Sequence, residues 1–380
     1  MPTILRQCEA LASRCDLQVW ATIPWFPGVP LFRHLRHATE KVSKIPRVDN
    51  LFGLKVNHPR TFYIPRMAFS SAAGYALSIA RELIRCRKQV DVILATFAYP
   101  DGVAAIALGQ LLGIPTVVQV IGSDIEVVAK MGTVRPQVRL TFPRAAGVIA
   151  VSSTLAEQCE RLGAKREMIQ VIVTGVDRGA FAPRSREAAR SLLGLPAECK
   201  VILYVGRLSE QKGALDALRA FEHLQTEGDV RLVFIGDGPL RGQLQGRAAV
   251  RSNVIVTGSL DGKEVSTWLA ACDFLTLPSY HEGTPNVILE ALSSGRPVVA
   301  TRIGGIPDVC CSAAYGELVS PGAIEELTQA YKRVLSSKYV PEEIAACPSL
   351  YGWDENARRV LDFLHRACNS GSTRVSKESF

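Results

Sequence analysis

The sequence has no apolar run long enough to cross a membrane. Stretches such as VDVILATF (90–97) and VILYVG (201–206) fall far short of the roughly 20 apolar residues that a membrane-spanning helix needs. The N-terminal stretch MPTILRQCEALASRC also lacks the succession of positive charge, apolar core and small-residue cleavage site that marks a secretory signal. Low-complexity tracts are absent as well. We therefore expect a globular protein that stays in the cytoplasm.

None of the ten cysteines shows the Cys-x-x-Cys spacing of a zinc site. Dispersed cysteines in a long chain without a secretion signal are most simply buried, reduced thiols. We therefore expect free cysteines and no bound metal.

Length and charge both divide the chain. At 380 residues it exceeds one ordinary core, so two domains are expected. Residues 1–175 hold 21 Lys and Arg against 12 Asp and Glu, whereas residues 176–380 hold 23 against 24. The whole net charge of +8 therefore lies in the first half.

The basic excess is concentrated in residues 33–66, where eight basic side chains stand against Glu40 and Asp49. Aromatic side chains lie among or beside them: Trp25, Phe26, Phe32, Phe52, Phe62 and Tyr63. Such a surface suits an anionic membrane face or a phosphorylated acceptor. A solvated basic loop region explains the pattern equally well. Nucleic acid is the weaker interpretation, because no binding motif accompanies the charge.

Short β-rich runs alternate with longer helical patterns along the whole chain. The predicted strands are 17–23, 90–96, 115–121, 147–152 and 169–173, then 201–206, 230–236, 253–258, 274–278 and 297–301. Predicted helices between them include 101–112, 154–162, 213–226, 263–271 and 286–294. Apolar strands joined by helices indicate parallel sheets covered on both faces. We therefore expect an α/β fold of two doubly wound, Rossmann-like domains that face one another across a cleft.

Domain boundaries follow from the segment 174–200, which separates the two strand series and contains Gly, Pro and charges. We place the first domain at 1–176 and the second at 177–352. Residues 353–380 are expected to form a helix to about 368, packed back on the first domain, and then a disordered tail. ILRQCEALASRC (4–15) is typical of the first helix of such a domain. We therefore expect a late start, with the first strand and its Gly-rich turn missing.

Residues 206–213, GRLSEQKG, follow a predicted strand directly and open a helix. Glycine at a strand-to-helix turn lets a ligand approach the backbone, and a helix N-terminus favours anions. Arg207 and Lys212 add two cations at the same place, which together suit a diphosphate. An ordinary turn with two surface cations explains the motif equally well. The order of residues differs from that of a P-loop.

The stretch SYHEGTPNVILEALSSGRPVVAT (279–301) places two glutamates eight positions apart. Glu282 follows a predicted strand on a glycine-containing loop, and Glu290 projects from one face of the helix that comes next. Carboxylates at these places can accept hydrogen bonds from sugar or ribose hydroxyls. The alternative for Glu290 is a solvated helix position, which its apolar neighbours disfavour.

GRLSEQKG, followed by WLAACDFLTLPSYHEGTPNVILEALSSGRPVVATRIGGIPD, resembles the carboxyl-terminal domain of the retaining glycosyltransferases of family 4, which have the two-domain GT-B fold. The matching block covers about 201–322. The first half is a looser match, whose clearest points are 7–14, 23–28, 120–124 and 173–181. The segment IPWFPG (23–28) is similar to the corresponding segment of family members that build bacterial exopolysaccharide or teichuronic-acid-type polymers.

The resemblance implies a role for each matched residue. Arg207 and Lys212 would bind the diphosphate and stabilise it as the leaving group. Glu282 would hold donor-sugar hydroxyls beside the anomeric carbon. Asp124 would serve the sugar or the acceptor, with a buried helix cap as an equal alternative. The other donor contacts would come from Gly206, Gly258, Leu260, Gly283, Thr284, Glu290, Gly304 and Gly305, of which Glu290 would bind the ribose.

The resemblance also implies a reaction. A sugar would pass from a nucleotide diphosphate sugar, UDP favoured over GDP, to a lipid-linked or saccharide acceptor in cell-surface polysaccharide synthesis. The anomeric configuration would be retained without a protein nucleophile or a cofactor. The basic first half separately suggests that this cytoplasmic protein binds the inner face of the plasma membrane. No Asp-x-Asp pair occurs in the chain, which agrees with stabilisation of the diphosphate by cations and not by a metal. The base, the sugar and the acceptor stay open.

Departures from the family pattern motivate other hypotheses. Many members have His where this chain has Ile121, and that His contacts the donor sugar. Together with the late start, Ile121 suggests a truncated, non-catalytic protein that still binds nucleotide sugars. A sugar epimerase on the same fold is a third hypothesis, which the Glu282 and Glu290 block with GRLSEQKG disfavours.

Overall fold

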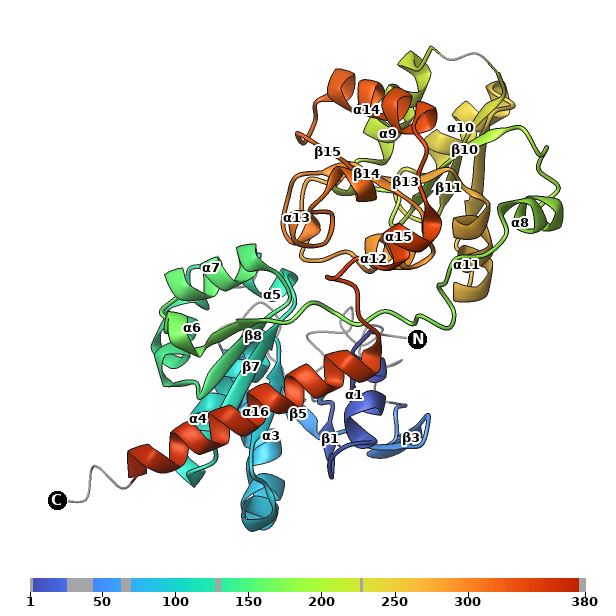
Figure 1. The fold of residues 1–380 in the computed structure, drawn as a ribbon. Helices are drawn as coiled ribbons and strands as arrows, with labels where there is room; N and C mark the ends of the chain where they lie inside the picture. Colours follow the sequence, from blue (N-terminus) through green and yellow to red (C-terminus); the bar gives the residue numbers. More distant parts are fainter. Residues whose placement is uncertain (1–2, 26–43, 63–69, 127–130, 226–227, 376–380) are drawn as a thin grey trace. The chain divides into compact units, whose positions relative to one another are not determined.

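The structure, a computed structural model, describes residues 3–25, 44–62, 70–126, 131–225 and 228–375. It divides the chain into two compact units. Unit 1 comprises Met1–Ile172 and Trp353–Phe380, and unit 2 comprises Val173–Gly352. The chain therefore leaves unit 1 once, builds unit 2, and returns to unit 1 through its last helix (Figure 1).

Unit 1 is built on a parallel sheet with the strand order β6-β7-β8-β9. Its strands are β6 (Ile93–Thr96), β7 (Thr116–Val120), β8 (Gly147–Ala150) and β9 (Ile169–Val171). Strands β7 and β8 are buried along their whole length, as expected of the inner strands of a parallel sheet. The connecting helices include α3 (Ser71–Cys86), α4 (Val103–Leu112), α5 (Ser123–Glu126), α6 (Arg135–Thr141) and α7 (Ser153–Arg161).

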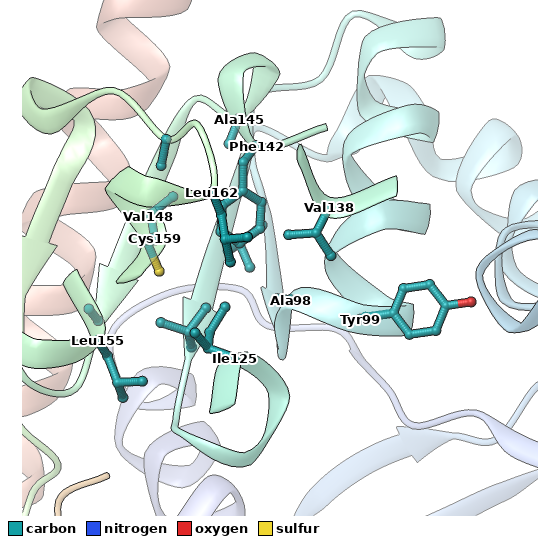
Figure 2. Packing of buried hydrophobic residues seen from close by; sticks show 14 of the residues in the cluster. Ala98, Tyr99, Ile125, Val138, Phe142, Ala145, Val148, Leu155, Cys159 and Leu162 are labelled. Atoms are coloured by element: carbon teal, nitrogen blue, oxygen red, sulfur yellow. The ribbon is translucent and has the colours of Figure 1, made fainter. Parts of the chain in front are cut away.

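The core of unit 1 joins this sheet to its helices. Val138, Phe142 and Cys159 are fully buried there and converge from α6, the turn after it, and α7 (Figure 2). Tyr99 enters the same core from the segment after β6, and its hydroxyl accepts a hydrogen bond from the backbone N–H of Ala72 at 3.3 Å. The core therefore fixes the chain at the carboxyl ends of β6 and β7.

The predicted strand at 17–23 is wrong, because the structure splits it between two small sheets. Strand β1 (Val19–Trp20) pairs with β4 (Leu54–Asn57), which also pairs antiparallel with β3 (Val48–Leu51). Strand β2 (Ile23–Trp25) pairs with β5 (Arg60–Phe62). Of the basic segment 33–66, residues 33–43 and 63–66 lie outside the described residues.

The first and last helices of the chain lie together in unit 1. Helix α1 (Thr3–Ala12), predicted as the opening helix, contacts α16 (Trp353–Val375), and the Gln7 amide donates to Asn356 Oδ1 at 3.1 Å. A Cβ on Gly147 of β8 would lie 2.7 Å from the Phe363 ring, so the glycine lets α16 approach the sheet. Helix α16 continues to Val375, which corrects the predicted end near 368. Among the described helices, none is long and apolar enough to cross a membrane.

Unit 2 is built on a parallel sheet of six strands with the order β12-β11-β10-β13-β14-β15. The strands are β10 (Lys200–Val205), β11 (Val230–Ile235), β12 (Val254–Gly258), β13 (Phe274–Leu277), β14 (Val298–Thr301) and β15 (Gly316–Val319). The first five were predicted, whereas β15 was not. Helices of this unit are α8 (Arg186–Leu192), α9 (Ala214–His223), α10 (Arg241–Val250), α11 (Gly262–Ala271), α12 (Asn286–Ser293), α13 (Ile306–Val309), α14 (Ile324–Ser336) and α15 (Pro341–Ala345).

Candidate active site

The strand order of unit 2 marks the place where a ligand is expected to bind. The chain runs outward from β10 through β11 to β12, then returns to place β13 on the other side of β10. In open α/β sheets, ligands bind at the carboxyl ends of the strands where the order reverses. The loops after β10 and β13 meet at this point. They carry Arg207 and Lys212 on one side and Glu282 on the other.

The loop after β10 is fixed from below by a buried tyrosine. The Tyr204 side chain is fully buried, and its hydroxyl donates towards the carbonyl oxygens of Arg207 at 3.0 Å and Lys212 at 3.1 Å. Leu208, also fully buried, anchors the middle of the loop. The Arg207 side chain stays exposed, and within the described part of the chain no carboxylate pairs with it. The backbone of the loop is therefore fixed, and the loop presents the exposed guanidinium of Arg207.

Glycines at the strand ends let neighbouring loops approach closely. A Cβ on Gly236, after β11, would lie 1.9 Å from the carbonyl oxygen of Gly206, after β10. Gly236 in turn donates its backbone N–H to the carbonyl of Gly258, at the end of β12, at 2.8 Å. Leu260 follows, half-buried, before α11. The predicted residues Gly206, Gly258 and Leu260 thus lie along the carboxyl edge of the sheet.

Gly213 joins the loop after β10 to the loop after β13. Its φ is +66°, and a Cβ there would lie 2.0 Å from the carbonyl oxygen of Pro278. The backbone N–H of Tyr280 donates to the Gln211 carbonyl at 2.9 Å, so the two loops also share a main-chain hydrogen bond. The glycine is therefore required both by the backbone conformation and by the approach.

An ion pair joins the same two loops through their side chains. Lys212 Nζ donates to Glu282 Oε1 at 2.7 Å, and the hydroxyl of the fully buried Ser279 donates to the same oxygen at 2.8 Å. The Glu282 side chain is 7% exposed and that of Lys212 is 33% exposed. Glu282 Oε2 receives no hydrogen bond from the described residues. One carboxylate oxygen therefore positions the side chain, and the other can accept a ligand hydroxyl.

Gly304 and Gly305 hold the Glu282 loop from the other side. Gly304 has φ +52°, and a Cβ there would lie 2.0 Å from the carbonyl oxygen of Glu282. The backbone N–H of Gly305 donates to the Gly283 carbonyl at 2.5 Å. Thr284 is half-buried just before α12. These contacts bring the predicted Gly283, Gly304 and Gly305 together around Glu282.

Glu290 lies in the second turn of α12, with its side chain half-buried. No described residue donates a hydrogen bond to its carboxyl group, and burial raises its pKa to about 7. Burial disfavours the ionised form of a carboxyl group. Glu290 is therefore not the solvated helix position that we weighed as an alternative.

Asp124, the predicted site residue of unit 1, has both carboxylate oxygens occupied. Oδ2 accepts from the backbone N–H of Ala98 at 2.7 Å, and Oδ1 accepts from Gly122 at 3.0 Å and Ile121 at 3.3 Å. The residue is 2% exposed. These contacts join the segments after β6 and β7 and give Asp124 a structural role, although its donors precede α5 and differ from the N–H groups that a helix cap accepts from.

Asp101 is a titratable residue of unit 1 that sequence analysis missed. It lies between β6 and α4, in the segment Ala98–Gly102, where the Tyr75 hydroxyl donates to its carboxylate and Thr22 bonds to Tyr75. Burial is the main cause that raises the pKa of Asp101 to about 7; the hydrogen bond from Tyr75 opposes this rise and the nearby Asp124 adds to it. No cation pairs with it among the described residues. A single Asp in the segment AYPDG (98–102) does not predict such burial from the sequence.

The two halves of the chain each match a family. Residues 3–179 match Glycosyltransferase Family 4, and residues 199–337 match Glycosyl transferases group 1. A relative from Bacillus subtilis (strain 168), named as the teichuronic acid biosynthesis glycosyltransferase TuaC, is 32% identical over 334 residues, which cover 84% of this chain and 81% of that protein. The 2-deoxystreptamine glucosyltransferase of Streptomyces kanamyceticus is 30% identical over 359 residues, with coverage of 87% and 88%.

Solved structures resemble this chain over nearly its whole length. Anabaena HepE, in complex with UDP and glucose, has a TM-score of 0.69 at 20% identity, covering 96% of each chain. Sucrose-phosphate synthase from Thermosynechococcus elongatus has a TM-score of 0.67 at 19% identity, covering 98% of this chain and 92% of that one. Likeness at such identity shows the fold. The predicted α/β class is confirmed, with two Rossmann-like domains of the GT-B fold.

Replacing Gly213 by Ala tests the junction of the two loops. We expect Gly213→Ala to lower the free energy of unfolding by about 1–3 kcal/mol more than Gly194→Ala, because only the former meets a backbone carbonyl. Gly194 is the matched control: its φ is +64°, and nothing lies within 4 Å of a Cβ there. Chemical denaturation of both variants measures the difference. Equal losses would contradict the close approach at Pro278.

Replacing Asp101 by Asn tests its buried carboxyl group. The folded pKa of about 7 lies above the ordinary value of 3.8, so the carboxyl group costs stability progressively as pH rises between these values. Asp101→Asn should therefore unfold with a free energy about 1–3 kcal/mol higher than the wild type at pH 8, and with no difference near pH 4. Denaturant unfolding at several pH values measures this. Asp91→Asn, at an exposed position, is the control, expected within about 0.5 kcal/mol of wild type. A gain independent of pH would contradict the assignment.

Proposed function

The chain belongs to glycosyltransferase family 4, and from that premise we propose that it is a retaining enzyme that moves a sugar from a nucleotide diphosphate sugar to a lipid-linked or saccharide acceptor. One observation carries the proposal: the Lys212–Glu282 ion pair lies at the strand-order reversal of unit 2, beside the exposed Arg207. The site therefore offers cations for a diphosphate and a carboxylate for a sugar within one pair of joined loops.

The two cations bind the leaving group in this proposal. Arg207 is exposed and unpaired among the described residues, so its guanidinium can take two phosphate oxygens at once. Lys212 has three N–H donors, and Glu282 Oε1 occupies one of them. The ammonium can therefore keep its partner while it donates to a phosphate. As the bond to the sugar breaks, both groups stabilise the negative charge that develops on the diphosphate.

Glu282 holds the transferred sugar. Its Oε2, which accepts nothing from the described residues, takes a sugar hydroxyl, while Ser279 and Lys212 fix Oε1. Backbone N–H groups of Gly283 and Thr284 help to place the ring. The acceptor attacks from the face that the diphosphate leaves, and the departing phosphate oxygen takes the acceptor's proton. Retention then follows without a protein nucleophile, and charge neutralisation by Arg207 and Lys212 serves where other enzymes use a metal.

The donor is a UDP-sugar in this proposal, with its ribose on Glu290 and its base beside Gly258 and Leu260. The UDP bound by HepE, a protein of the same fold, supports this choice over GDP. The name of the Bacillus relative supports an acceptor in cell-surface polysaccharide synthesis. The excess of basic residues in 1–175 supports a place in the cytoplasm at the inner, anionic face of the membrane.

Calorimetric titration with UDP and UDP-glucose tests the roles of the two loops. Arg207→Ala should weaken binding of both ligands at least tenfold, because both contain the diphosphate. Glu282→Ala should weaken UDP-glucose by a similar factor and leave UDP nearly unchanged, because UDP has no sugar for it to hold. Lys332→Ala, which removes an exposed cation on α14, is the control and should change neither affinity.

Two outcomes of this titration would contradict the proposal. Unchanged affinities in both variants would remove the basis of the site. A loss of UDP binding in Glu282→Ala equal to that in Arg207→Ala would mean that Glu282 only supports the loop.

The pH dependence of UDP-glucose binding tests Glu290. Ribose hydroxyls bind best to an ionised carboxylate, whereas the pKa of about 7 leaves Glu290 mostly protonated at pH 6. Affinity should therefore rise up to about tenfold from pH 6 to pH 8 and level off above the pKa. Glu290→Gln should bind more weakly at pH 8 and lose this dependence. The same slope in both proteins would assign the titration to another group.

A further inference from the structure

A cavity of about 410 Å³ adjoins the two joined loops of unit 2. Its walls come from the loop after β10, the first turns of α9 and the loop after β13. The side chains that matter are Gln211, Asp216, Arg219, Tyr280 and His281. Its volume falls in the range of small-molecule sites, about 300–1,000 Å³. None of the residues assigned above to the donor lines it.

The cavity and the Lys212–Glu282 ion pair are formed by neighbouring residues of the same two loops. Gln211 and His281 line the cavity, whereas the next residue along each loop, Lys212 or Glu282, forms the ion pair. The hydrogen bond from Tyr280 N–H to the Gln211 carbonyl locks this arrangement. A molecule in the cavity would therefore contact residues that are adjacent in sequence to Lys212 and Glu282.

Hydrogen bonds hold several polar groups of the cavity in place. Asp216 is 6% exposed, and the Tyr280 hydroxyl donates to its Oδ2 at 2.7 Å. Arg219 donates to Asp216 Oδ1 at 3.4 Å, so the buried carboxylate has a cation beside it. The hydrogen bond to Asp216 raises the pKa of Tyr280 above its ordinary value. The tyrosine ring is held in one orientation as a result, and it is 40% exposed.

This lining suits a neutral saccharide. Gln211 and His281 are exposed, and they provide donors and acceptors that match hydroxyl groups, while the fixed Tyr280 ring offers an apolar face. Glu210 and Asp216 contribute carboxylates to the same walls, which disfavours an anion such as a phosphate. The polar lining also disfavours a lipid chain.

We propose that this cavity is a second carbohydrate subsite, which binds a neutral sugar of the acceptor beside the donor site. The inference rests on the proposed function, because it is the adjoining ion pair that makes a bound sugar an acceptor. It assigns acceptor recognition partly to unit 2, through Gln211, Tyr280 and His281. The donor residues Arg207 and Glu282 take no part in it.

Ligand-observed NMR with saturating UDP present tests this subsite separately from the donor site. The probes are methyl α-glucopyranoside, methyl N-acetyl-glucosaminide and glucose 6-phosphate. We expect saturation transfer to at least one neutral glycoside in the wild type. The signal should fall at least fivefold in the double variant Gln211→Ala/His281→Ala and persist in Glu282→Ala. Both replaced side chains in the double variant are exposed, so its melting temperature should match that of the wild type.

Each other outcome overturns the inference. A signal lost in Glu282→Ala but kept in the double variant would place the sugar in the donor site. A stronger signal from glucose 6-phosphate than from either neutral glycoside would identify an anion site. UDP titration of the same samples separates the two claims: UDP binding without any glycoside signal rejects the subsite alone, and the absence of both rejects the proposed function as well.

Discussion

The ion pair between Lys212 and Glu282 is the contact on which the site depends. It joins the loops after β10 and β13, which are 70 residues apart in sequence and adjacent only because the sheet reverses its order there. A carboxylate that is 7% exposed would be costly to bury alone, and its bonds to the Lys212 ammonium and the Ser279 hydroxyl offset that cost. Removing either the ammonium or the hydroxyl would therefore leave the buried Glu282 carboxylate with one partner fewer.

Backbone geometry makes that contact possible. Gly213 and Gly304 lie on the two sides of the Glu282 loop, each with positive φ and each with a carbonyl oxygen where a Cβ would be. The buried Tyr204 hydroxyl fixes the loop after β10 independently. With the backbone set in this way, little reorganisation would be needed to bind the diphosphate of the proposed donor, and preorganised donors are the condition for effective electrostatic stabilisation of a leaving group. The cavity beside Tyr280 is a consequence of the same pairing of loops.

The sequence predicted what depends on local pattern. The inner strands of both sheets are continuous apolar runs, and GRLSEQKG and the two glutamates follow strands, so their place at the carboxyl edge of unit 2 could be deduced. The short strands β3 and β4 could not be predicted, because the four-residue segments VDNL and LKVN are too short to be distinguished from a loop. Features that depend on tertiary contacts could not be predicted from the sequence either. These are the raised pKa of Asp101, the hydrogen bonds that hold Asp124, and the cavity beside Tyr280.

A crystal structure of the protein with UDP-glucose would test the central claim most directly. We expect diphosphate oxygens within about 3 Å of both the Arg207 guanidinium and Lys212 Nζ. We also expect a glucose hydroxyl on Glu282 Oε2, with Ser279 still bound to Oε1. A diphosphate bound away from the loop after β10, or a glucose that does not touch Glu282, would contradict this claim.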